Sequence, residues 1–161
     1  WKKVGYGTTV KPDKYDSALL YGLEAGKYRL ALKTPKDQII NIEYTRDKSK
    51  KKAAYKKSKA INLKSDIDSI YTSTEKAARW YKASVSSTKK RKAVTLSKDS
   101  VGGGFKFCVY QKGKRLKTVK VTKNDKVKTV KLPKKKGAYY VKVTKLTSKT
   151  TGAYYLGTYT Y

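Results

Sequence analysis

The sequence predicts an all-β protein, an antiparallel β-sandwich of jelly-roll type with at most one or two short helical turns. Apolar and polar residues alternate with a period of two in many short segments, which is typical of half-buried strands. Turn residues separate these segments at regular, short intervals, as in β-sandwich domains. A content of 38% hydrophobic and 12% aromatic residues is sufficient for a buried core.

Residues 1–47 contain four of the expected strands and are interpreted as a partial repeat. Leu23–Lys33 parallels Leu132–Thr144, because each has a turn, a Gly, an aromatic residue and then an alternating strand. Four strands bury too little apolar surface to be stable by themselves. We therefore expect residues 1–47 to pack onto the rest of the chain as extra strands or to pair with a second copy of the chain. These strands are 4–10, 17–23, 27–33 and 38–45, with Tyr28, Leu30 and Leu32 expected in the core.

Residues 48–58 form a basic connector with few core candidates. We expect a helical turn around Lys52–Lys57 and a second one at Thr74–Ala78. No other helix is expected.

The remaining segment, 59–161, carries the clearest alternation and is expected to form the main sandwich. Turns are predicted at 111–114, which contains Gly113, and at 123–125, where Asn and Asp form local turn bonds. The expected strands are 59–63, 67–72, 79–86, 92–97, 104–111, 114–122, 126–132, 138–145 and 152–160. The side chains expected in their core are Trp80 or Tyr81, Val85, Phe105, Phe107, Val109, Tyr139, Val141, Val143 and Leu156.

The charge of the chain points to an anionic surrounding or partner. The formal net charge is +30 on 161 residues, and only five of the 41 basic residues are Arg. Lys acts as a hydrated point charge, whereas the Arg guanidinium reads phosphate or guanine bidentately. The composition therefore favours diffuse, salt-sensitive attraction over reading of a nucleic-acid sequence. Part of the Lys coat can also protect exposed sheet edges from aggregation.

The sequence offers little material for catalysis. It contains no His to act as a base, and the single Cys108 therefore has no imidazole partner. Glu24, Glu43 and Glu75 lie in unrelated contexts, and Ser–Lys proximity is uninformative in so Lys-rich a chain. We expect no enzyme activity and no cofactor.

Metal and phosphate sites are also not expected. Asp66 and Asp68 supply two carboxylates, whereas a hard cation such as calcium takes six or more oxygens. The Gly-rich run 102–104 lacks the Lys-Ser/Thr pair and the helix that a P-loop needs. A turn or bulge is the simpler interpretation of these glycines.

Alternation assigns an outward position to a few side chains that could contact a ligand. In the pairs Tyr139-Tyr140 and Tyr154-Tyr155, the second Tyr should face out among lysines. Exposed Tyr can stack on sugar rings, prolines or bases, or merely form cross-strand pairs that stabilise the sheet. The candidate ligand-binding residues are Lys106, Lys120, Tyr140, Lys142 and Tyr155.

Residues 59–161 resemble the bacterial pre-peptidase C-terminal domain. The similarity lies in an Ala and an apolar strand at the start, a Trp-Tyr strand, a hairpin and two closing Gly-aromatic strands. One departure is Arg79, which stands before the Trp-Tyr pair where the family often has an acidic residue. The resemblance implies a secreted β-sandwich and an extracellular or cell-wall location. The matching segments are Lys59–Leu63, the short strand Ile67–Tyr71, Trp80–Val85, Phe105–Lys114, Gly137–Val143 and Gly152–Leu156.

Together these observations predict a non-catalytic, secreted or cell-surface module for binding or adhesion. Its expected partner is an anionic polymer, such as a cell-wall polymer or an acidic glycan, or a host matrix protein. One alternative is a passive spacer or accessory domain of a larger secreted protein. A second is a non-specific nucleic-acid binder, favoured by charge alone. No apolar run approaches the length of a membrane helix, so no membrane insertion is expected.

Overall fold

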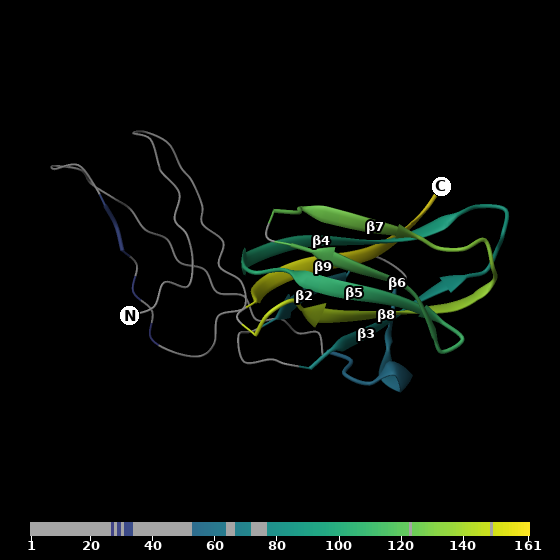
Figure 1. The fold of residues 1–161 in the computed structure, drawn as a ribbon, viewed down its shortest axis with the longest axis horizontal. Coiled ribbons are helices and arrows are strands. Elements are labelled where there is room, and N and C mark those ends of the chain that lie inside the picture. Colours follow the sequence, from purple (N-terminus) through teal and green to yellow (C-terminus); the bar gives the residue numbers. More distant parts are fainter. Residues whose placement is uncertain are drawn as a thin grey trace.

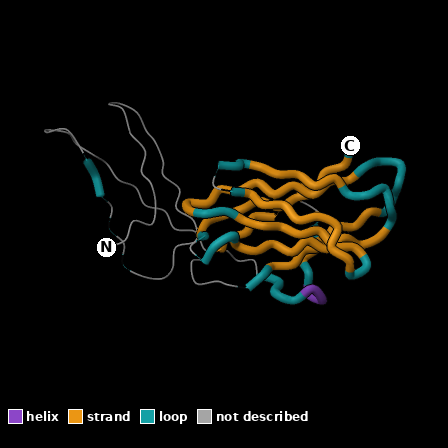
Figure 2. The backbone as a smooth tube through the Cα atoms, in the orientation of Figure 1, coloured by secondary structure: helices purple, strands orange, loops and turns teal. Residues whose placement is uncertain are grey.

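The described chain is a sandwich of two β-sheets (Figure 1). The computed structural model describes residues 53–63, 67–71, 77–122, 124–148 and 150–161, together with 27, 29 and 31–33. Figure 2 shows that these residues are almost entirely strand and loop, with a single helical turn. The predicted all-β sandwich is therefore confirmed.

One layer is a five-stranded sheet with the order β1-β3-β8-β5-β6. Neighbouring strands in this sheet are antiparallel, except for the short parallel pair of β1 and β3. The strands are β1 (Ile61–Asn62), β3 (Arg79–Val85), β8 (Gly137–Lys145), β5 (Phe105–Gln111) and β6 (Lys114–Val121).

The second layer is a four-stranded antiparallel sheet with the order β2-β9-β4-β7. The register of β4 with β9 shifts between Asp99 and Gly102, next to the Gly run that was predicted as a bulge or turn. The strands are β2 (Ile67–Tyr71), β9 (Thr151–Thr160), β4 (Lys92–Gly102) and β7 (Val127–Lys131).

The core lies between the two sheets and is built from the alternate side chains of each strand. In β3, β5 and β8 the inward side chains are buried, as the period of two predicted. Tyr81, and not Trp80, is the buried member of its pair. The expected core residues Val85, Phe105, Phe107, Val109, Tyr139, Val141, Val143 and Leu156 are all buried.

Two tyrosine hydroxyl groups join the sheets at the centre of the core. Tyr81 in β3 and Tyr154 in β9 are 1% and 0% exposed, and their hydroxyl groups hydrogen-bond to each other. Their rings meet edge to face, with centroids 6.4 Å apart. Phe105 packs on the same Tyr154 ring at 5.0 Å. A polar bond is thus enclosed by aromatic surface.

The hairpin between β5 and β6 closes through a two-residue turn, as predicted. Gln111 pairs with Lys114, and the intervening Lys112 and Gly113 have φ values of 48° and 80°. Positive φ at both central positions is the type I′ geometry, which matches the twist of the strands. Gly113 meets this requirement without steric cost.

The predicted turn at 123–125 is anchored by Asp125. Its carboxylate accepts hydrogen bonds from the backbone N–H and the hydroxyl of Thr122, at 2.9 and 2.7 Å, and pairs with Lys128 at 2.7 Å. The hydrogen bond from Lys128, followed by those from Thr122, lowers the pKa of Asp125 well below its usual range.

Three expectations for the N-terminal part need comment. Leu32 is 54% exposed and 31–33 form no strand, so the predicted core position of Leu32 is wrong. Alternation makes a strand only where a neighbouring strand and an apolar surface are available, and 31–33 have no ladder partner. Tyr28 and Leu30, with the other strands predicted in 1–47, lie outside the described residues.

The expected helical turn is displaced toward the C-terminus. A 3-10 turn spans Lys57–Lys59, whereas 53–55 are not helical. The carbonyl of Ala54 accepts a hydrogen bond from the backbone N–H of Trp80 at 2.8 Å, so it is not used in a helix. In the predicted turn at 74–78, only 77 and 78 are described, and neither is helical.

A double-mutant cycle on the central tyrosines should show that their hydroxyl bond couples the sheets. We expect Tyr81→Phe and Tyr154→Phe each to lower the free energy of unfolding by about 1 kcal/mol. The double variant should lose less than the sum of the two, because either change alone breaks the same bond. Urea unfolding measures all three values, and strict additivity would contradict the coupling.

Candidate functional site

The outer face of the five-stranded sheet collects basic and aromatic side chains from four strands. Strand register places Lys82, Tyr140, Tyr110 and Arg115 in one row across β3, β8, β5 and β6. The next row begins with Trp80 and Lys142, and Lys106 lies opposite Lys120 in a third. We call this set, together with Lys57, the cationic face: Lys57, Trp80, Lys82, Lys106, Tyr110, Arg115, Lys120, Tyr140 and Lys142.

The aromatic residues Trp80, Tyr110 and Tyr140 lie beside one another at the centre of this face, and we call them the aromatic strip. The rings of Trp80 and Tyr110 are 5.6 Å apart with an interplanar angle of 45°. Tyr110 lies directly opposite Tyr140 in the register of β5 and β8. All three side chains are half-buried, so each ring is held by its neighbours and still presents surface to solvent.

Two lysines lie over the rings of this strip. The Lys142 ammonium is 5.5 Å from the centre of the Trp80 ring, and that of Lys57 is 4.7 Å from the centre of the Tyr140 ring. Both distances are within the range of cation–π attraction. The apolar stems of the lysines can cover the rings while the charged ends remain in water. A ligand that stacks on the rings would therefore meet positive charge immediately beside them.

Lys57 reaches the face from outside the sheet. It belongs to the 3-10 turn Lys57–Lys59, which precedes β1. The preceding segment is fixed to β3 by the hydrogen bond from the Trp80 backbone to Ala54, and Ala54 is buried. A segment interpreted from sequence as part of the connector thus contributes to the face.

The strands that form this face contain no acidic residue. None of the five strands contains Asp or Glu, and the only acidic residues in the sequence from 76 to 161 are Asp99 and Asp125. Burial, and then the neighbouring Cys108, raises the pKa of the Tyr110 phenol. The strands of this sheet therefore supply positive charge and neutral aromatic surface.

Four of the five candidate residues from the sequence lie on the cationic face: Lys106, Lys120, Tyr140 and Lys142. Tyr155 lies on β9, in the other sheet, and is 39% exposed. The five residues therefore do not form one site. Lys57, Trp80 and Tyr110 were not among the candidates, although the alternation of β5 had already placed Tyr110 on the same side as Lys106.

Other kinds of site find little support in the described residues. They contain no group of three or more side chains suited to hold a metal ion. Asp66 lies outside the described residues. Cys108 is buried, with its sulfur 3.4 Å from the hydroxyl oxygen of Thr118. No helix within the described ranges is long and apolar enough to cross a membrane.

Comparison with known proteins gives a similarity at the level of structure. No family model matches the sequence. No curated protein matches it either. The structure is similar to the pre-peptidase C-terminal domain of a collagenase from Bacillus anthracis, with 18% identity and a TM-score of 0.48. The match covers 62% of this chain and 92% of that domain. This is the kind of domain that the sequence resembles.

The electrostatic character of the face can be tested without a ligand. In a Trp1→Phe variant, Trp80 is the remaining Trp and its fluorescence reports on the face. With quenching by each ion expressed relative to free N-acetyltryptophanamide, we expect iodide to quench it more strongly than caesium, because local positive charge concentrates anions and repels cations. Lys142→Gln should reduce quenching by iodide, whereas Lys131→Gln on the other sheet should not. Equal relative quenching by both ions would contradict a cationic face.

Proposed function

We propose that this protein is a non-catalytic module of a secreted or cell-surface protein, and that it holds anionic polymers on its cationic face. The observation that carries the proposal is the strip of Trp80, Tyr110 and Tyr140 with Lys57 and Lys142 over its rings. Aromatic faces can stack on sugar rings, and ammonium groups attract the acidic groups of the polymer.

Binding on this face would be the sum of many weak contacts. Exposed Lys side chains gain little from any single ion pair in water. A polymer that spans several rows of the sheet engages many of them together, so affinity grows with polymer length. The aromatic strip adds a preference for polymers with flat rings. Acidic glycans and cell-wall polymers fit both features.

A second candidate is non-specific binding of single-stranded nucleic acid. It is favoured by the same strip, because exposed aromatic residues on a sheet can stack bases while a basic surface follows the backbone. The predominance of Lys over Arg and the proposed extracellular location favour a glycan or wall polymer instead.

Binding should depend on the position of the charges as well as on their number. We expect a Lys106→Gln, Lys120→Gln, Lys142→Gln variant to bind heparin and wall teichoic acid more weakly and with a shallower salt dependence. The matched control is Lys126→Gln, Lys131→Gln, Lys134→Gln, which has the same net charge and should bind nearly as the wild type.

Affinity measurements with heparin, wall teichoic acid and single-stranded DNA at rising salt distinguish the functions. Equal losses of affinity in both triple variants would mean that lysines over the whole surface bind the polymer, and not the cationic face in particular. Preferential binding of DNA would favour the second candidate. Failure to bind any polyanion at low salt would leave a spacer role.

Salt should have opposite effects on stability and binding. The dense positive charge repels itself in the folded state, and added salt screens this repulsion. The melting temperature is therefore expected to rise between low and moderate NaCl concentrations while the affinity for heparin falls. Thermal unfolding followed by circular dichroism checks the first effect. A melting temperature that falls with NaCl would show that attractive ion pairs outweigh the repulsion.

A further inference from the structure

The outer face of the four-stranded sheet has a different chemistry from the cationic face. Strand register places its outward residues of β9, β4 and β7 in three rows. The central row contains only small or hydroxyl residues, and the two flanking rows begin with tyrosines. The rows are Tyr155, Ser97 and Val127; Gly157, Thr95 and Thr129; and Tyr159, Ala93 and Lys131.

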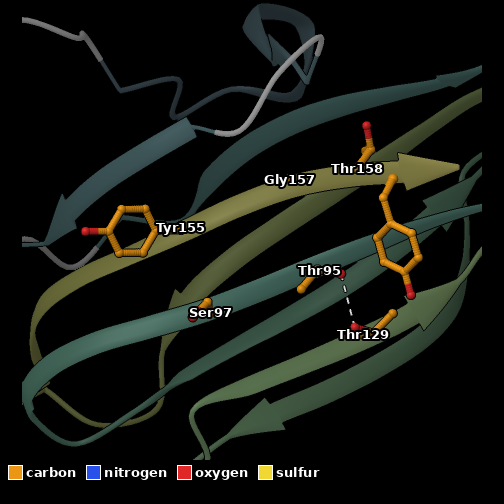
Figure 3. Close-up of a pocket in the computed structure, with 7 residues that line it drawn as sticks. Thr95, Ser97, Thr129, Tyr155, Gly157 and Thr158 are labelled. Carbon is orange, nitrogen blue, oxygen red and sulfur yellow. Dashed lines mark hydrogen bonds between the residues drawn. The ribbon is translucent and has the colours of Figure 1, made fainter.

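The central row is the floor of a hollow between the tyrosines. Gly157 has no side chain, and Tyr155 and Tyr159 project on either side of it from the same strand. Four strand residues span about 13 Å, so the tyrosines stand well apart along β9. The hollow has a volume of about 400 Å³, within the range of small-ligand sites. Figure 3 shows Tyr155 on one side, with Thr95 and Thr129 below.

The floor of the hollow offers hydroxyl groups. The hydroxyl oxygens of Thr95 and Thr129 are 3.0 Å apart and hydrogen-bonded, and Ser97 lies beside them. The Ser97 hydroxyl donates to the carbonyl of Lys126 at 3.3 Å, so its oxygen remains available as an acceptor. Each hydroxyl group can donate one hydrogen bond and accept others, so the bonded pair keeps capacity for a ligand. The side wall is reinforced, because the Tyr159 ring packs on that of Tyr161 at 5.6 Å.

The lining of the hollow is uncharged. All seven residues that line it are Thr, Ser, Tyr or Gly, in a chain with a net charge of +30. The one charged residue in the three rows is Lys131, and its ammonium lies over the Tyr161 ring, 5.6 Å from the ring centre. A ligand that needs charge complementarity would gain more on the opposite sheet.

We propose that this hollow, which we call the tyrosine groove, binds an uncharged, unbranched glycan. Tyr155 and Tyr159 would stack on separate sugar rings, and the chain between them would pass over Gly157. Sugar hydroxyl groups both donate and accept hydrogen bonds, which matches the bonded hydroxyl pair of Thr95 and Thr129 and the acceptor oxygen of Ser97. This second site is independent of the proposed function of the cationic face.

A proline-rich peptide is the main competitor for such a groove, because extended peptides also dock between aromatic rings. Such a peptide presents mainly carbonyl acceptors to its binding site. The floor of the tyrosine groove offers acceptors as well as donors, which suits a ligand made of hydroxyl groups. A glycan therefore uses the floor more fully.

The test is a titration of the whole protein with cellohexaose, chitohexaose and a proline-rich decapeptide, followed by ¹H–¹⁵N NMR. We expect at least one glycan, at millimolar concentration, to shift the amide signals of Thr95, Ser97, Thr129 and Gly157. Its affinity should not change with salt, which separates this site from polyanion binding. Tyr155→Ala or Tyr159→Ala should weaken binding about tenfold, the loss of one ring stack.

Gly157→Val separates binding from stability. Gly157 does not have a positive φ, so its backbone conformation accepts other residues, and a β-branched residue suits a strand interior. The variant should therefore melt no lower than the wild type and yet lose glycan binding, because its side chain fills the groove. Tyr55→Ala, an exposed Tyr that belongs to neither the tyrosine groove nor the cationic face, is the matched control and should leave glycan binding unchanged.

Three outcomes would overturn the proposal. One is the absence of any glycan-induced shift at millimolar concentration. Another is a set of shifts that maps to the cationic face, or that responds to Tyr140→Ala and not to Tyr155→Ala. The third is binding of the proline-rich peptide alone in the groove. Should Gly157→Val fail to fold, the surface variants Tyr155→Ala and Tyr159→Ala still decide between these results.

Discussion

The constraint on which this structure depends is the two-residue period of the β-strand. Each strand must place alternate side chains between the sheets, where they bury the apolar surface that holds the sandwich together. The Tyr81–Tyr154 bond lies within this space, where the two buried hydroxyl groups pair with each other. The same period leaves the other half of each strand outside, where it contributes little to the core. Function is therefore free to develop on two separate outer faces.

Alternation alone was sufficient to decide which side chains point inward in the clearest strands. It placed Tyr139 and Tyr154 inside and Tyr140 and Tyr155 outside, as the structure has them. It failed at Leu32, because a pattern does not state whether a stretch finds a neighbouring strand. It left Trp80 and Tyr81 undecided, because both are large and aromatic; the register of β3 with β8, which pairs Tyr81 with Val141, settles the choice.

The composition of the two outer faces could be predicted only in part, because the sequence does not say which strands share a sheet. Tyr140 and Tyr155 have the same local pattern, yet β8 and β9 belong to different layers. The tyrosine groove depends on the register of β9, β4 and β7, which aligns Gly157 with Thr95 and Thr129. These residues are far apart in sequence, and their pairing depends on long-range contacts. Local alternation carries no information about such contacts.

The separation of the two layers has a consequence for how the faces act together. Packed sheets lie about 10 Å apart, so the outer faces point in opposite directions across the core. A single ligand chain cannot contact both faces without passing around an edge of the sandwich. With both proposed sites occupied, the module would join two different polymers, one anionic and one neutral. A linked pair of weak sites gains effective concentration when both polymers belong to the same matrix. Such bivalence would give firm retention in a mixed matrix while each separate contact remains exchangeable.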